Sequence, residues 1–158
     1  LEHAPELPWS GTWLNLTNVT LTSDPWRGID TSIASTQQRY YRARQLNFAP
    51  DSFAGKTVVA TVTNAGPFVV TLVFAAHTVT ETNGGDVQTG TYSYSRTSPV
   101  MAMLNEWLTS PPDVAGDASQ TQLTFTSPAG GTFVSISYAD PGDLPETALG
   151  TFQISDTP

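Results

Sequence analysis

The positive charges of this chain are concentrated in one stretch. Five of its six lysines and arginines lie within residues 27–56, and residues 38–45 read QRYYRARQ. On a strand, Tyr40, Arg42 and Arg44 would share one face, because alternate side chains point the same way. A guanidinium group can hold an oxyanion through two hydrogen bonds while an aromatic ring stacks on the ligand. The segment therefore predicts a site for a carboxylate or sugar ligand or, alternatively, ion pairs with the acidic last third of the chain.

Proton transfer is a second chemistry that the side chains allow. The ordinary pKa of a histidine side chain lies near neutrality, so in a cavity His77 could act as a base, with Tyr40 as the acid and Arg42 stabilising negative charge. The apolar residues around it, 73–79, predict a strand. On such a strand the alternative is a histidine that is hydrogen-bonded within the core or wall.

Carboxylates are further candidates for acid–base chemistry. Glu106 lies close to Met103 and Trp107 on a predicted strand, and Glu81 follows an apolar run. Burial of Glu106 would raise its pKa and suit it to proton transfer. On the surface of a strand it would simply be solvated, so both interpretations stay open.

Aromatic residues are candidates for stacking on a ligand. Tyr92 and Tyr94 alternate in the strand-like stretch GTYSYS at residues 90–95 and share one face. Trp107 and Trp26 are the other candidates, because four tryptophans in a chain of this size suffice for a carbohydrate platform. The alternative is that these rings pack in the core or in a lid over it.

The composition excludes several functional classes. The chain has 158 residues, no cysteine, two histidines and a formal charge of −8. Without cysteine there are no disulfides, thiol nucleophiles or cysteine-bound metal centres. The scarcity of cations makes nucleic acid a poor partner. The sequence also has no apolar run of the ~18 residues that a membrane-spanning helix needs. The aspartate-containing loops at 113–117 and 140–143 match no calcium motif, so we expect neither a metal nor a cofactor.

Short strands with frequent turns account for most of the pattern. Threonine is the commonest residue, with 24 copies, and eight to ten strands are predicted at intervals of ~8–12 residues. The sequence Asn-Gly-Gly-Asp at 83–86 predicts a tight hairpin. Residues 100–108 have high helix propensity, but they also alternate with period 2, and a strand is favoured because a meander expects one there.

These elements predict one all-β domain over residues 1–158. Residues 1–50 would form an N-terminal extension with the first strands, and residues 53–154 would form a single antiparallel up-and-down β-barrel, whose closure removes exposed sheet edges. The low content of charged residues, 13%, is common in exported bacterial proteins. We therefore expect a secreted, periplasmic or cell-surface location, with any export signal already removed.

Glycine and aromatic residues recur in short motifs through residues 53–154. They are Phe53-Ala-Gly-Lys-Thr57, Gly66-Pro-Phe68, Leu72-Val-Phe74, Gly90-Thr-Tyr-Ser-Tyr94, Ala102-Met-Leu104, Leu123-Thr-Phe-Thr-Ser127, Gly131-Thr-Phe133 and Gly150-Thr-Phe152. This set resembles a small β-barrel module of bacterial exported proteins and of MoaF-like proteins in the calycin (lipocalin-like) group. The resemblance implies an up-and-down barrel whose mouth can hold a small ligand, and it does not imply catalysis. The first 50 residues and the loop at 109–119 depart from that module.

Three functions follow as hypotheses. The first is a barrel that binds a small or carbohydrate-like ligand, including an anionic one, in its mouth, lined by Tyr40, Arg42, Arg44 and the aromatic candidates. The second is a cofactor-free lyase, isomerase or cyclase that uses His77, Tyr40 and Arg42. The third is a structural or adhesive domain of a cell-surface protein. An open, polar-lined cavity would favour the first two, whereas a barrel packed solid with phenylalanine would favour the third.

Overall fold

The computed structural model describes residues 1–4, 13–15, 40–42, 46–64, 68–139 and 144–158. The chain divides into two compact units, residues 1–45 and 46–158. Every regular element in the described ranges is a β-strand. The division lies close to the predicted junction between extension and barrel, and the single domain over residues 1–158 remains a prediction.

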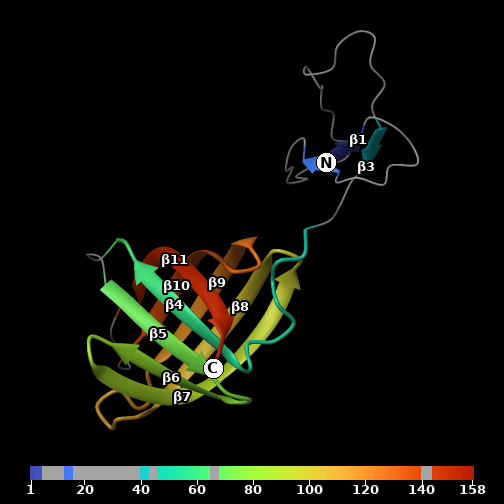
Figure 1. The fold of residues 1–158 in the computed structure, drawn as a ribbon. Coiled ribbons are helices and arrows are strands. Elements are labelled where there is room, and N and C mark those ends of the chain that lie inside the picture. Colours follow the sequence, from blue (N-terminus) through green and yellow to red (C-terminus); the bar gives the residue numbers. More distant parts are fainter. Residues whose placement is uncertain (5–12, 16–39, 43–45, 65–67, 140–143) are drawn as a thin grey trace. The chain divides into compact units, whose positions relative to one another are not determined.

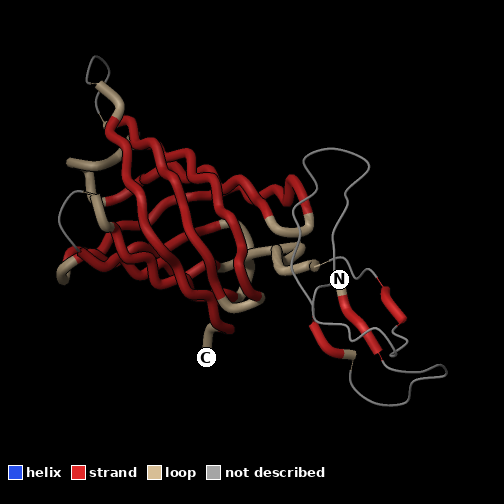
Figure 2. Tube along the Cα trace, turned by 90° about the horizontal axis from the view of Figure 1, so that it is seen from above, coloured by secondary structure: helices blue, strands red, loops and turns tan. Residues whose placement is uncertain are grey.

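The second unit is a closed antiparallel barrel of eight strands (Figure 1). Each strand pairs with the next along the chain, and the last pairs with the first, so the predicted all-β up-and-down barrel is confirmed. Figure 2 shows the same strands in a perpendicular view, with turns at their ends. The strands are β4 (Lys56–Val62), β5 (Phe68–Phe74), β6 (Thr78–Asn83), β7 (Asp86–Ser98), β8 (Met101–Ser110), β9 (Ala118–Ser127), β10 (Gly130–Tyr138) and β11 (Glu146–Asp156).

Local sequence explains the best-defined hairpin and the one ambiguous segment. Gly84 and Gly85 connect β6 to β7 with φ angles of 59° and 109°, which glycine adopts without steric cost. The helix-prone stretch at 100–108 is strand β8, and its buried residues alternate with more exposed ones. Pairing with β7 and β9 on both sides overrides its intrinsic helix propensity.

Alternation along the strands fills the barrel interior with apolar side chains. The buried core residues on the strands are Val58, Val62, Val70, Leu72, Phe74, Val79, Ala102, Leu104, Leu123, Phe125, Phe133 and Phe152. Aromatic rings close one end of the barrel. Phe53 is fully buried there, stacked on Tyr94 with 4.4 Å between ring centroids, and 5.1 Å from Phe74. This end is therefore solid.

The opposite end of the barrel is bounded by different connections. They join β4 to β5, β6 to β7, β8 to β9, and β10 to β11. Among them, the β8–β9 connection forms a series of turns. Leu108 at its base donates its N–H to the carbonyl oxygen of Asp117 at 2.9 Å and accepts a hydrogen bond from the N–H of Gly116 at 3.0 Å. The interior near this end carries several polar side chains, and it holds the cavity described below.

The first unit contains a small antiparallel sheet of three short strands in the order β2-β1-β3. They are β1 (Glu2–Ala4), β2 (Leu14–Asn15) and β3 (Tyr40–Arg42). Within it, Arg42 Nε donates to Oε2 of Glu2 at 2.6 Å, and its guanidinium carbon lies 4.5 Å from the ring centroid of Trp13.

The described residues include no helix long and apolar enough to cross a membrane.

Candidate functional site

A cavity of about 360 Å³ occupies the barrel interior between the aromatic plug and the opposite end. Its floor is apolar and is formed by buried residues of the core. The apolar lining consists of Phe53, Val58, Ala60, Val62, Phe68, Val70, Leu72, Leu104, Leu108, Leu123, Phe133, Ala148 and Phe152, with Ala118 and Ala139 nearer the loops. The volume lies within the range of cavities that bind small organic ligands.

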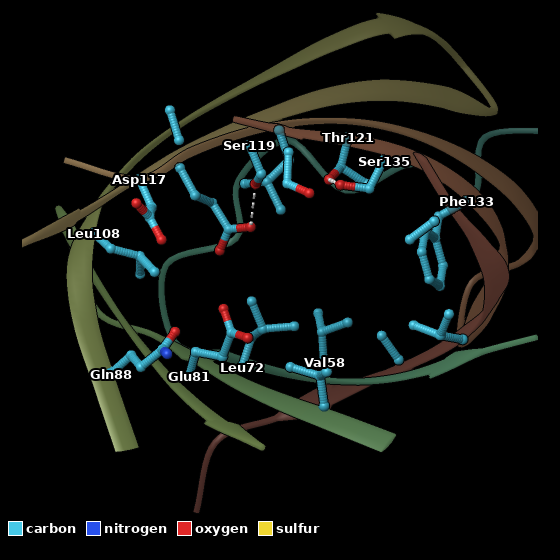
Figure 3. Close-up of a pocket in the computed structure, with 18 of the residues that line it drawn as sticks. Val58, Leu72, Glu81, Gln88, Leu108, Asp117, Ser119, Thr121, Phe133 and Ser135 are labelled. Carbon is cyan, nitrogen blue, oxygen red and sulfur yellow. Dashed lines mark hydrogen bonds between the residues drawn. The ribbon is translucent and has the colours of Figure 1, made fainter. Parts of the chain in front are cut away.

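Polar side chains gather on the β8–β10 side of this cavity. Ser119, Thr121 and Ser135 point into it from β9 and β10, opposite Val58 and Leu72 (Figure 3). The hydroxyl of Thr121 donates to Oγ of Ser135 at 2.8 Å, so these two residues satisfy one another. These strands therefore contribute most of the polar lining toward one end of the cavity, whereas Leu104, Leu123 and Phe133 on the same strands are apolar.

Glu106 is the most deeply buried charged residue that lines the cavity. It lies on β8 with only 8% of its surface exposed. Ser119 donates its hydroxyl to Oε2 of Glu106 at 3.2 Å, the dashed line at Ser119 in Figure 3. Oε1 of the same carboxyl group is buried and has no partner among the described residues. A buried polar atom without a partner is costly, so this oxygen is available to accept a hydrogen bond from a ligand.

A second carboxyl group, Glu81, projects into the cavity from β6, beside Leu72 (Figure 3). The pKa of Glu106 is raised to about 7, chiefly by burial and in addition by the negative charge of Glu81, while the hydrogen bond from Ser119 opposes the change. Burial also raises the pKa of Glu81. Both groups are therefore easier to protonate than ordinary glutamates, since a low-polarity environment disfavours their charged forms.

The cavity reaches the surface at the end opposite the aromatic plug. Five of its lining residues there are exposed: Phe68 at the start of β5, Ser137 and Tyr138 at the end of β10, Ala139 just after it, and Glu146 at the start of β11. Asp117 adds another carboxylate from the loop before β9. No lysine, arginine or histidine is found among the described residues that line the cavity. Its charge is therefore negative wherever its carboxyl groups are ionised.

The structure places Glu106 in this site, but it locates the two predicted tyrosines at the other end of the barrel, in the plug. Tyr94 donates its hydroxyl to the carbonyl oxygen of Pro50 at 2.7 Å, and Tyr92 donates to that of Ala75 at 2.8 Å. Burial raises the pKa of both phenols, that of Tyr94 to about 12. They close the barrel and do not line the cavity.

The prediction that His77 lies on an apolar strand is wrong. It lies in the turn between β5 and β6 and is exposed. Strand β5 ends at Phe74 because the chain reverses there, and Ala75 and Thr78 close the turn with a backbone hydrogen bond of 2.9 Å. Trp107 faces outward from β8 with 46% of its surface exposed, since its neighbour Glu106 faces inward. Neither lines the cavity.

The remaining candidates belong to the first unit. Tyr40 and Arg42 lie on β3, where Arg42 is bonded to Glu2, so at least one arginine of the cluster forms an ion pair. Trp26 and Arg44 lie outside the described residues. Neither Tyr40 nor Arg42 is among the residues that line the barrel cavity, and the ligand site predicted around the arginine–tyrosine segment remains a prediction.

Sequence reasoning missed most of the polar lining of the cavity. Ser119, Thr121, Ser135 and Asp117 were not candidates, because serine and threonine occur on both faces of these strands. One signal was available: along β9 and β10 the inward positions change from apolar to polar toward one end, as in Phe125, Leu123, Thr121 and Ser119. Among the described residues, no three histidine, aspartate or glutamate side chains converge as a metal site would require.

Together the fold and the cavity define a class of protein. It is a small closed antiparallel barrel with one packed end and an internal cavity that combines an apolar floor with buried carboxyl groups. The topology is compatible with a calycin-like barrel. Comparison of the chain with protein-family models, curated proteins and solved structures found no match.

Proposed function

We propose that this protein binds a small, mostly apolar organic molecule inside the barrel. The observation that carries the proposal is the cavity of about 360 Å³, in which one buried carboxyl oxygen of Glu106 has no partner among the described residues. Cavities of this kind bury the body of a ligand against apolar residues, and a few polar groups fix its orientation. A cavity also favours binding over a purely structural role, for which a solid interior would suffice.

The chemistry of the lining narrows the class of ligand. Its apolar floor suits an aromatic or branched aliphatic body, whereas hydroxyl and carboxyl groups near the mouth suit hydrogen-bond donors. An anionic ligand, which the arginine-rich segment suggested, is disfavoured here because it would add negative charge beside Glu81 and Glu106. A sugar is also disfavoured by the apolar floor. The proposed ligand is thus neutral or cationic.

The affiliation with MoaF-like calycins and the exported location belong to the same proposal. The motifs over residues 53–154 and the eight-strand topology support the affiliation. The low content of charged residues, 13%, supports the location by association alone.

Binding can be tested with 1-naphthylmethanol, a neutral compound with a rigid apolar body and one hydroxyl group. Titration into the ¹⁵N-labelled protein should shift amide resonances of β6, β8 and β9 around the cavity. Ala148→Trp, which fills the cavity, should abolish these shifts, and Leu149→Trp, which adds the same ring to the exposed side of β11, should leave them unchanged. Shifts that persist in Ala148→Trp, or the absence of shifts in the wild type, would overturn the proposal.

A second candidate function is cofactor-free proton transfer, as in a lyase or isomerase. It is favoured by the raised pKa of Glu106, about 7, because a general base works best when its pKa lies near the operating pH. In this function Glu106 would remove a proton from a carbon atom next to a carbonyl group, and protonated Glu81 would donate a hydrogen bond to the resulting enolate oxygen.

The test for proton transfer uses 2-tetralone, a ketone of naphthalene size, in D₂O. Catalysed exchange of its α-hydrogens for deuterium, followed by NMR, should exceed that of buffer and should be lost in Glu106→Gln. Exchange at the buffer rate would reject this candidate and would leave the binding proposal intact.

A further inference from the structure

We propose that Glu106 and Glu81 form a head-group site that selects ligands carrying a protonated amine. This inference rests on the proposed binding function and deepens it by naming the chemical class of the ligand. It concerns the polar end of the ligand, whereas the binding proposal concerns only the cavity and the apolar body.

The geometry of Glu106 carries the first step. Its carboxyl group lines the cavity, more than nine-tenths of the residue is buried, and Ser119 occupies only Oε2. Oε1 therefore presents a free acceptor to whatever enters the cavity. A donor on the ligand would satisfy this atom and remove the cost of leaving it unpaired.

The charges around Glu106 carry the second step. The titratable groups that face it are Glu81 from β6 and Asp117 from the loop before β9, with Glu146 and Tyr138 at the mouth. Its cross-strand neighbour on β7, Tyr92, already donates to Ala75. None of these groups is cationic, so no protein cation among the described residues of the cavity compensates the negative charge.

An ammonium group meets both requirements. It has three donors and a positive charge, so it can bind Oε1 of Glu106 and interact with Glu81 at the same time. Hydrogen bonds between ionised partners are roughly twice as strong as those between neutral ones, and the apolar floor limits screening by water. A hydroxyl group offers one donor and no charge, and a carboxylate head would be repelled.

The pH dependence follows from the same arrangement. Because the pKa of Glu106 is raised to about 7, the carboxyl group is mostly protonated at pH 5 and mostly ionised at pH 8. An amine that stays protonated over this range should bind more tightly as the pH rises, and the gain should level off above neutrality. A neutral alcohol should change less, because it can donate to the ionised form and accept from the protonated one.

Three compounds with the same body and different head groups test the inference. They are 1-naphthylmethylamine, 1-naphthylmethanol and 1-naphthoate, titrated by calorimetry and by amide chemical shifts at pH 5 and pH 8. At pH 8 the amine should bind about tenfold or more tightly than the alcohol, as expected for a charge-assisted hydrogen bond, and the carboxylate should bind most weakly. At pH 5 the advantage of the amine should shrink.

Matched variants identify the groups responsible. Glu106→Gln keeps the size of the side chain and an acceptor for Ser119, and it should remove most of the preference for the amine while changing the affinity of the alcohol less than threefold. Glu81→Gln should reduce the preference to a smaller extent. Asp113→Asn removes the same charge from an exposed loop position outside the lining and should preserve the preference.

The outcomes separate this inference from the binding proposal. Equal affinity of amine and alcohol at pH 8, or an unchanged preference in Glu106→Gln, overturns the amine site and leaves the cavity a binding site. An equal loss in Asp113→Asn also overturns it, because the preference would then reflect overall charge. If none of the three compounds shifts the resonances of the cavity, the binding proposal itself fails.

Discussion

The hydroxyl of Ser119 donates to Oε2 of Glu106 at 3.2 Å, while Oε1 of the same carboxyl group is buried without a partner among the described residues. The contact between Ser119 and Glu106 results from the pairing of β8 with β9, in which the two residues are direct cross-strand neighbours. The barrel thus holds a carboxyl group in place by one oxygen and leaves the other available.

Glu106 should make the stability of the protein depend on pH. Its pKa is about 7 in the folded state, whereas in the unfolded chain it returns to about 4.5, so the folded state binds more protons between these values. The free energy of unfolding should therefore fall as the pH rises from 4.5 to 7, by roughly 3 kcal/mol from this group. Urea denaturation of the wild type and of Glu106→Gln at pH 5 and pH 8 measures the difference.

The Glu106→Gln variant should lose this part of the pH dependence and gain stability relative to the wild type at pH 8. Asp113→Asn serves as the control for the loss of one negative charge. If the free energy of unfolding of Glu106→Gln fell between pH 5 and pH 8 as much as that of the wild type, Glu106 would have an ordinary pKa and would not be buried.

Phe53 should be a major contributor to stability, because its fully buried ring closes one end of the barrel against Tyr94 and Phe74. Phe53→Ala should lower the free energy of unfolding by about 3–5 kcal/mol, since the deletion leaves a cavity in the plug. The exposed β4 position Val59 provides the control, and Val59→Ala should cost less than about 1 kcal/mol. Comparable losses in both variants would contradict a solid end.

The hydroxyl of Tyr94 should contribute separately from its ring. Tyr94→Phe retains the stacking on Phe53 but removes the donor to the carbonyl oxygen of Pro50. Loss of one such hydrogen bond should cost about 1–2 kcal/mol, as measured by thermal unfolding. Tyr138→Phe, at an exposed position, should leave the stability nearly unchanged. If Tyr94→Phe also left the stability unchanged, the segment before β4 would be held by contacts other than this hydrogen bond.

Gly150 should not tolerate a side chain. A Cβ at this position of β11 would collide with the carbonyl oxygen of Thr61 and would lie 2.7 Å from the ring of Phe133, which lines the cavity. Gly150→Ala should therefore destabilise the barrel by about 1–3 kcal/mol and shift the resonances of Phe133. Thr151→Ala, at the exposed neighbouring position, should have a much smaller effect. If the two variants were equally stable, β11 would lie farther from β4 and β10 than the structure shows.

His77 should have no part in binding within the cavity. It lies in the β5–β6 turn, whereas the residues of β5 that line the cavity end at Leu72. His77→Ala should change the affinity for 1-naphthylmethanol less than twofold at any pH between 5 and 8. A larger loss would restore the hypothesis that His77 is the base of a catalytic site.

The strands of the barrel were largely predictable. The strand-like stretch predicted at residues 90–95 lies within β7, and the glycines at 84 and 85 adopt the positive φ angles that the turn was expected to need. These signals are local, because alternation and turn chemistry are properties of neighbouring residues. The segment at 100–108 was ambiguous for the same reason: helix propensity and strand alternation are both local, and pairing with β7 and β9 decides between them.

The site was predictable only in part. The sequence singled out Glu106 by its apolar surroundings, but it could not decide whether the residue faces the interior or the solvent. It also favoured His77 and Trp107, which lie in a turn and on the outer face. A shift of one position in a strand exchanges the two faces, so orientation depends on the register of the whole sheet.

From the sequence alone, this protein is determined to be an all-β chain of short paired strands, rich in turns and free of thiol chemistry. The tertiary structure alone decides that the strands close into a ring, that phenylalanine and tyrosine fill one end of it, and that Glu81 and Glu106 face one cavity at the other. The physical reason is that closure brings together inward positions from strands far apart in the chain. Burial in the same cavity then raises the pKa of both glutamates.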